Sequence, residues 1–183
     1  MRATEILIKE HDSILEMLGV LGKVCDKLEA GDAVVPEHLE EILSFLQGFA
    51  DQCHHGKEED LLFPAMEASG IPREGGPIGV MLLEHVQGRE FIQRMIAAVA
   101  SLKEAGPRAP SEFVGAGRDY VRLLTQHIEK ENNVLFRMAD MRIPESKQQE
   151  LEQQFDVVDK EKIGTDQIEQ HLQKLDELKQ RYL

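Results

Sequence analysis

Apolar residues recur at every third or fourth position along four long stretches of this chain, and this periodicity constrains the fold more than any other feature. A helix returns to the same face after three, four and seven residues, so this spacing produces one apolar stripe along a helix. Strand signals are scarce by comparison, so we expect an all-α fold. The stripe of the first stretch consists of Leu7, Ile14, Leu18, Leu21, Cys25 and Leu28.

Three breaks divide the first part of the chain into four predicted helices. The first helix ends at Gly31-Asp32, and Pro36 favours the start of the second, because proline is common at the first helical position. The segment Ser69–Pro77 ends the second helix, and Glu104–Ser111 separates the third from the fourth. Four helices of roughly 25–30 residues joined by short loops predict an up-down-up-down four-helix bundle over residues 1–143.

Residues 144–183 differ from the predicted bundle in composition. They are richer in Gln, Lys and Glu, and their apolar stripe is thinner. A break at Gly164-Thr165 predicts two further helices. We expect this C-terminal helical extension to pack on the bundle or on a protein partner rather than to carry out chemistry.

The charge and the hydropathy of the chain exclude several classes of partner. A formal net charge of −13 argues against nucleic acid, because phosphate binding requires clustered Lys and Arg, and also against anionic membrane surfaces. No apolar run approaches the ~20 residues that span a bilayer, and the N-terminus lacks a signal-peptide pattern. Two cysteines, Cys25 and Cys53, are too few for a disulfide framework. We therefore expect a cytoplasmic protein that binds neither nucleic acid nor a membrane.

Ionisable residues interrupt the apolar stripes of all four predicted helices. Ala50, four residues before His54, and Leu61, seven residues after it, share its helix face and place His54 inside the bundle. His55 and Glu59 lie about 100° further round the helix, and we expect them at the rim. The same reasoning identifies six inward residues: His11, His54, Glu58, His85, His127 and Glu131.

The inward residues belong to an internal repeat. Matching residues are 73 or 74 positions apart: His11 and His85, His54 and His127, Glu58 and Glu131, and Phe63 and Phe136. The chain therefore predicts two helical hairpins, each with a His on its first helix and His-x-x-x-Glu on its second. Two such hairpins can pair about a pseudo-two-fold axis, which would bring four imidazoles and two carboxylates to one level.

These six groups predict a metal centre. Burying them unpaired would cost several kcal/mol in total, even at the low end of ~1–3 kcal/mol per group, and a hydrogen-bond network would not require the repeat. Four imidazoles and two carboxylates are too many for one tetrahedral zinc ion and suit two ions bridged by Glu58 and Glu131. The donors favour two iron ions, and manganese or mixed occupancy is compatible with them. Each ion would keep a position for dioxygen, nitric oxide or peroxide.

The sequence around these residues resembles the hemerythrin-like family, also called the HHE cation-binding domain. The resemblance covers roughly Thr4–Met141. It implies a four-helix bundle that holds a non-haem diiron centre and binds dioxygen reversibly or senses oxygen or iron. The matching motifs are "KEHD" around His11, "HHGKEEDLLFP" from His54, "LEHV" around His85 and "HIEKENNVLF" from His127.

Two positions depart from the pattern of an oxygen-carrying hemerythrin. Arg89 stands where that pattern has a second His on the third helix, and Glu131 follows His127 by four residues where that pattern has an Asp after five. The two His-x-x-x-Glu pairs resemble instead the diiron proteins that repair damaged iron–sulfur centres. We expect a protein that binds or senses dioxygen, a related diatomic or iron. The alternatives are a diiron enzyme that acts on nitric oxide or peroxide or donates iron, and an interaction bundle without metal.

Overall fold

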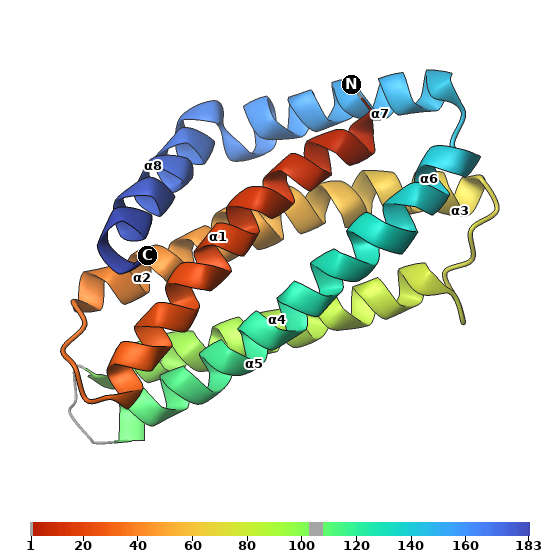
Figure 1. Ribbon diagram of the computed structural model, residues 1–183. Helices are drawn as coiled ribbons and strands as arrows, with labels where there is room; N and C mark the ends of the chain where they lie inside the picture. Colours follow the sequence, from red (N-terminus) through yellow and green to blue (C-terminus); the bar gives the residue numbers. More distant parts are fainter. Residues whose placement is uncertain (1, 103–107) are drawn as a thin grey trace.

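The computed structural model describes residues 2–102 and 108–183, which form no strand and consist almost entirely of helices. Four helical rods run alternately up and down (Figure 1). This arrangement confirms the predicted all-α bundle, although the expected break at 104–111 lies partly outside the described residues. The first rod is α1 (Ala3–Glu29) and the third is α4 (Pro77–Leu102). The second comprises α2 (Pro36–Phe45), η1 (Leu46–His55), η2 (Glu58–Leu62) and α3 (Phe63–Ala68), and the fourth α5 (Arg108–Lys130), η3 (Glu131–Leu135) and α6 (Phe136–Arg142).

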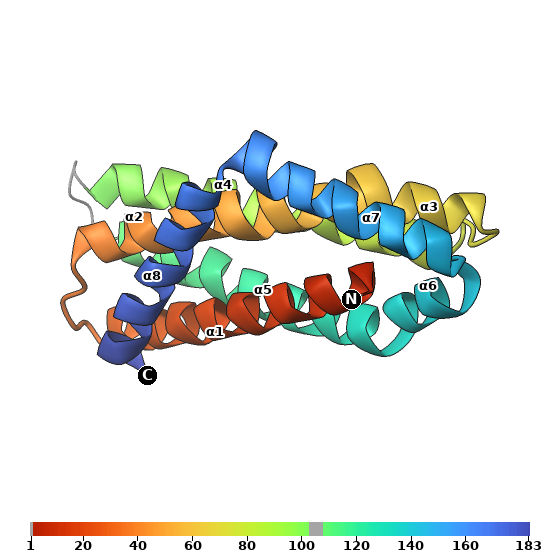
Figure 2. The same cartoon turned by 90° about the horizontal axis from the view of Figure 1, so that it is seen from above.

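The remaining residues form a helical extension along one side of the bundle. It consists of α7 (Glu145–Val157), η4 (Val158–Ile163) and α8 (Thr165–Tyr182), and it lies over α1 and the second rod (Figure 2). Gly164 separates η4 from α8 with a φ of +91°, a conformation that glycine adopts without steric cost. The predicted break and the packing on the bundle are thus confirmed, and the division into two units at residue 143 stays a prediction.

Two apolar clusters fill the interior and leave a polar layer between them. Every rod contributes to both clusters. On the first three rods the candidate His lies between the two contributions along the sequence, and on the fourth His127 directly precedes Ile128, the last residue of the larger cluster. On α1, for example, Leu7 belongs to one cluster, Ile14 to the other, and His11 lies between them. Burying one such aliphatic side chain contributes roughly 1.5–3 kcal/mol, so the clusters offset the cost of the polar layer.

The second and fourth rods change from α-helix to π-helix at matching places. The π-helices η2 and η3 begin at Glu58 and Glu131, 73 positions apart. Pro64 follows η2 as the second residue of α3, where its missing N–H removes one bond of the helical ladder. A further π-helix, η1, has no counterpart in the fourth rod, which is a regular α-helix at the matching residues.

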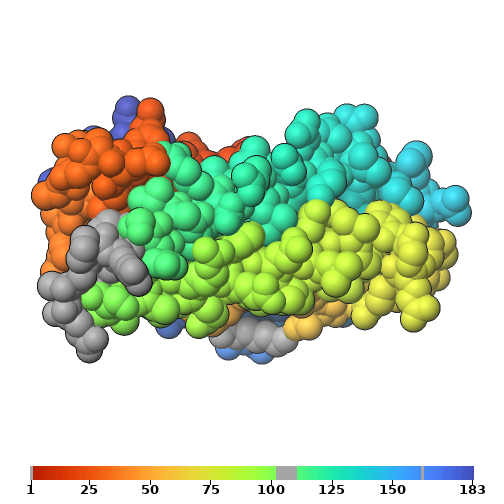
Figure 3. Space-filling view, turned by 90° about the horizontal axis from the view of Figure 1, so that it is seen from below, coloured from red at the N-terminus to blue at the C-terminus, as the bar shows by residue number. Residues whose placement is uncertain are grey.

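The face opposite the extension is formed by the third and fourth rods, which lie side by side (Figure 3). Several apolar side chains of these rods are exposed, including Val80, Leu83 and Val134. Within the ranges that the structure describes, no helix combines the length and the apolar character that a membrane span requires.

Candidate metal centre

The six inward residues that the sequence predicts lie together in the polar layer. Each is at most 1% exposed. The imidazoles form two pairs, one in each half of the layer: the Nε2 atoms of His11 and His54 are 2.9 Å apart, and those of His85 and His127 are 3.1 Å apart. Each pair joins one His from the first helix of a hairpin to one from the second. The repeat is thus present in the arrangement of the side chains as well as in the sequence.

The two carboxylates lie between the imidazole pairs. Glu58 places Oε1 3.5 Å from His54 Nε2 and Oε2 3.5 Å from His85 Nε2. Glu131 places Oε2 3.2 Å from the Nε2 atoms of both His11 and His127. Each carboxylate therefore contacts both pairs, which is the geometry that a bridging ligand between two ions requires.

Polar partners hold the outer nitrogen of every imidazole in the layer. Three of these partners are carboxylates, which only accept hydrogen bonds when ionised, so the Nδ1 atoms facing them donate. In a neutral ring the Nε2 atom then carries a lone pair directed toward the centre of the layer. The contacts are His54 to Glu10 at 2.8 Å, His85 to Glu59 at 2.7 Å, His127 to Glu84 at 2.9 Å and His11 to Asn132 at 2.8 Å.

Hydrogen-bond acceptors converge at the centre of this arrangement. All four carboxylate oxygens of Glu58 and Glu131 are buried without a hydrogen-bond partner. The Nε2 atoms of His11 and His54 also face each other, 2.9 Å apart. Buried acceptors that converge without donors repel one another, and a cation removes both the repulsion and the unsatisfied bonding. The residues present therefore fit bound metal ions.

His55 departs from the expectation that it lies at the rim. Its side chain is buried, and its ring stacks on that of His85 with the centroids 3.9 Å apart. The expectation assumed 3.6 residues per turn, whereas His55 ends the wider η1 π-helix, in which adjacent residues are less than 100° apart. The repeat carried a signal that would have corrected the error: residue 128, 73 positions after His55, is the inward-facing Ile128.

The additional imidazole divides the layer into two unequal sets of donors, which share Glu58. Within each set the potential ligand atoms lie within 4.8 Å of one another. We call one set the His11 group and the other the His55 group. The His11 group comprises His11, His54, Glu58 and Glu131, and the His55 group comprises His55, Glu58, His85 and His127.

Arg89 stands at the edge of the His55 group rather than on a purely solvated helix face. Its guanidinium donates to Asp51 at 2.8 Å and to Glu59 at 2.7 Å. These two carboxylates contact the Nδ1 atoms of His55, at 3.4 Å, and of His85. Arg89 thus holds the hydrogen-bond partners of two imidazoles, Asp51 and Glu59. Glu59, which the helical period places at the rim, is therefore one of these partners.

Burial and mutual charge shift the pKa values within the layer. Burial lowers the pKa of His54 and of His55 well below the usual value and keeps both rings neutral. Burial and the neighbouring Glu131 raise the pKa of the Glu58 carboxyl well above its usual range. Burial opposes the charged form of His127 too, but Glu131 and Glu84 raise its pKa to about 9. The carboxylates of the layer thus stabilise a positive charge on His127.

Aromatic rings close the layer on the side of the smaller apolar cluster. Phe63 stacks on His85 with the centroids 6.0 Å apart, and Phe136 stacks on His11 at 5.4 Å. The two Phe residues are 73 positions apart and belong to the same repeat as the imidazoles. Both are buried, so they exclude water from this side of the centre.

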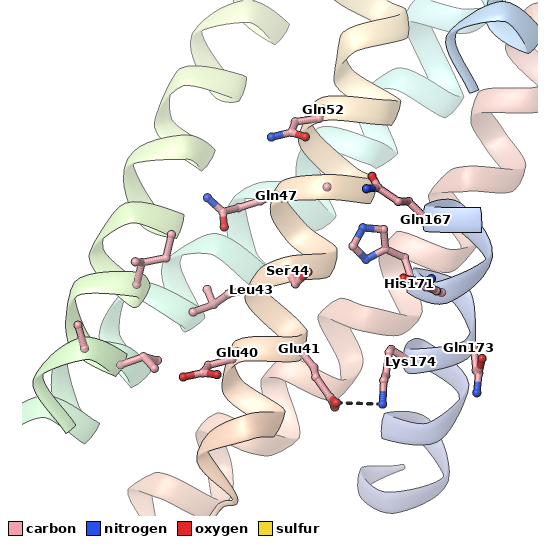
Figure 4. Close-up of a pocket in the computed structure, with 15 residues that line it drawn as sticks. Glu40, Glu41, Leu43, Ser44, Gln47, Gln52, Gln167, His171, Gln173 and Lys174 are labelled. Carbon is pink, nitrogen blue, oxygen red and sulfur yellow. Dashed lines mark ion pairs between the residues drawn. The ribbon is translucent and has the colours of Figure 1, made fainter. Parts of the chain in front are cut away.

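A cleft of about 890 Å³ lies elsewhere, along the second rod between α4 and α8, and none of the residues that line it belongs to the two groups. Figure 4 shows its polar lining, in which Lys174 of α8 is paired with Glu41 of α2 at 3.1 Å. His171 projects from α8 against Gly48 of the second rod. This cleft is part of the seam between the extension and the bundle.

Comparisons with known proteins point to cation binding. The family model described as the Hemerythrin HHE cation binding domain matches residues 2–139. The "Uncharacterized protein Rv1995" of Mycobacterium tuberculosis is 25% identical over 134 residues, 73% of this chain and 52% of that protein. The "Iron-sulfur cluster repair protein YtfE" of Salmonella schwarzengrund is 31% identical over 140 residues, 73% of this chain and 63% of that protein. The chain thus spans roughly half to two-thirds of these relatives' length, and no solved structure matches it.

Proposed function

Because the chain belongs to the hemerythrin family of HHE cation-binding domains, we propose that it holds two iron ions and binds or senses dioxygen or a related diatomic. The family match, over residues 2–139, includes all four motifs in which the sequence resembles this family. In this proposal one ion occupies the His11 group and the other the His55 group. Glu58 and Glu131, which each contact imidazoles of both pairs, would hold both ions.

The observation that carries the proposal is the set of unpartnered acceptors at the centre of the bundle. Four buried carboxylate oxygens and two imidazole pairs converge there. Mixed imidazole and carboxylate donors suit iron, and manganese is compatible with the same set. The unequal groups also suit two ions with different open positions, because the His55 group contains three imidazoles and the His11 group contains two.

The protein's part in this function is to hold, orient and shield the donors. When bound, the iron pair would supply a redox-active Lewis acid that accepts a small ligand. Glu10, Glu59 and Glu84 orient the imidazoles by accepting hydrogen bonds from their Nδ1 atoms. Phe63 and Phe136 exclude water from the adjoining side.

Metal analysis of the purified protein combined with its absorption spectrum in air tests the proposal. We expect two equivalents of iron and near-ultraviolet bands that zinc would not produce. Stopped-flow mixing of the reduced protein with dioxygen should then give a reversible adduct. Substoichiometric metal in protein produced with sufficient iron would instead favour an interaction bundle.

A second candidate function is the donation of iron to damaged iron–sulfur centres. The similarity to YtfE, which is named for cluster repair, supports this alternative. It predicts that the reduced protein transfers iron to an apo iron–sulfur protein faster than a chelator captures iron from the same sample. Turnover with nitric oxide or peroxide would point instead to a diiron enzyme, and a stable dioxygen adduct without transfer would favour binding or sensing.

A further inference from the structure

The internal repeat extends to the residues that hold His54 and His127. Glu10 accepts a hydrogen bond from His54 with one oxygen and pairs with Lys57 through the other. In the second hairpin, Glu84 contacts His127 and pairs with Lys130 in the same way. Lys57 and Lys130 are 73 positions apart. Each hairpin therefore contains one His–Glu–Lys chain that leads outward from the centre.

The two chains end differently because the extension covers only one of them. The side chain of Lys57 is fully buried, whereas that of Lys130 is 42% exposed. Asp159 of η4 pairs with Lys57 at 2.9 Å and accepts a weak hydrogen bond from Cys53 at 3.3 Å. The Lys57 ammonium also lies 5.8 Å from the centroid of Phe155 in α7.

The buried ammonium requires both of its carboxylates. Glu10 and Asp159 both pair with the fully buried Lys57 ammonium, so two carboxylates balance its charge. A Lys that loses one anionic partner in such a place must move toward water or be satisfied by the other partner alone. Lys57 has little room to reach water beneath η4, so a change at Asp159 would be transmitted to Glu10. Glu10, Cys53 and Asp159 also lie close enough together to hold a metal ion. The Lys57 ammonium already supplies the positive charge between the two carboxylates, so this cluster needs no ion.

We propose that Asp159 is a positioning residue for His54: through Lys57 it holds Glu10 against His54 Nδ1 and thereby links the C-terminal extension to the His11 group. The inference rests on the proposed metal binding. A carboxylate that accepts the Nδ1–H of a ligating imidazole fixes the ring and strengthens it as a donor, and loss of such outer partners weakens metal binding by about 10–100-fold. Replacement of Asp159 should therefore weaken the binding of only one of the two ions, the one in the His11 group.

Release of iron to a chelator in excess tests this selectivity. For Asp159→Asn, we expect the release of one of the two ions to accelerate about tenfold, near the lower end of the range for outer partners, while the other keeps its rate. The matched control is Asp156→Asn, because Asp156 is exposed on the same extension and its carboxylate pairs with Lys160 rather than with Lys57. It should release both ions as the parent does. Unchanged release in Asp159→Asn, or equal acceleration of both ions, would overturn the inference.

A second measurement separates failure of this inference from failure of the proposed function. In zinc-loaded protein, NMR should show a His54 Nδ1–H that exchanges slowly with water in the parent and at least about tenfold faster in Asp159→Asn. If the parent bound fewer than two iron ions, the proposed function would fail, yet this exchange rate would still decide the role of Asp159. An exchange rate that Asp159→Asn leaves unchanged contradicts that role, whatever the iron content.

Discussion

The ring of His55 lies nearly parallel to the ring of His85, with the centroids 3.9 Å apart and the planes 15° apart. Burial lowers the pKa of both imidazoles, so both rings are neutral and can offer a lone pair to the same ion. A residue that the helical period places at the rim thus joins the buried imidazoles of the polar layer, next to the position at which Arg89 departs from the oxygen-carrier pattern.

Replacement of His55 by Ile, the residue at the matching position of the second hairpin, should weaken metal binding at the His55 group. We expect at least a tenfold loss of affinity for one ion, because removal of a ligand exceeds the effect of removing an outer partner. Metal titration followed by absorption measures this loss. His38→Ala provides the control, because His38 contacts Tyr182 and lies outside both groups of donors. This variant should keep both ions. Equal losses of metal affinity in both variants would show that His55 is not a ligand.

The sequence predicted the bundle and the six converging residues because both depend on periodicity and on the repeat. The error at His55 arose where these two signals disagreed. A fixed step of about 100° failed inside the π-helix η1, which leaves no mark in the pattern of apolar residues. The repeat would have matched His55 with the buried Ile128.

Replacement of Glu58 by Gln should abolish stable binding of two ions and yet stabilise the metal-free protein above mildly acidic pH. Burial and Glu131 raise the pKa of Glu58 in the folded state above its ordinary value of 4.5. A group whose pKa is higher in the folded than in the unfolded state contributes stability that is complete below its unfolded-state pKa. This contribution is lost as the pH rises through its folded-state pKa. Gln has no such titration. The free energy of unfolding of Glu58→Gln minus that of the parent should therefore grow as the pH rises from 4.5.

Urea unfolding of both chelator-treated proteins at several pH values measures this difference. At neutral and alkaline pH we expect an advantage for Glu58→Gln of about 1–3 kcal/mol, the cost of a buried group left unsatisfied. In the presence of iron the order should reverse, because only the parent keeps both bridging carboxylates. A difference that does not vary with pH would show that Glu58 is satisfied without metal.

The link from the extension to the centre could not be predicted from the sequence. Lys57 lies three residues after His54, and such a Lys on a helix normally faces solvent. Its burial depends on Asp159, 102 positions later, and no local pattern connects the two residues. The apolar stripe of the extension indicated packing on the bundle but could not give the position of η4.

The two repeat-related lysines should differ in their contribution to stability. Lys57→Met should lower the free energy of unfolding of the metal-free protein by about 3–5 kcal/mol, because it leaves Glu10 and Asp159 without their shared cation. Lys130→Met removes a partly exposed pair and should cost less than about 1 kcal/mol. Denaturant unfolding of the two variants side by side tests the contrast. Similar costs would mean that the extension does not bury Lys57 in solution.

Two glycines on α5 should respond in opposite directions to the same substitution. A Cβ added at Gly117 would lie 2.8 Å from the Sγ atom of Cys25 on α1, inside the packed core, so Gly117→Ala should cost about 1–3 kcal/mol. At Gly115 a Cβ would meet nothing within 4 Å, and Ala should stabilise the helix by about 0.5–1 kcal/mol. Thermal unfolding gives both values. Adding Cys25→Ala to Gly117→Ala removes the sulfur atom and should restore part of the loss, because the overlap between α1 and α5 disappears. If the double variant were no more stable than Gly117→Ala alone, the close contact between these two helices would not be the cause.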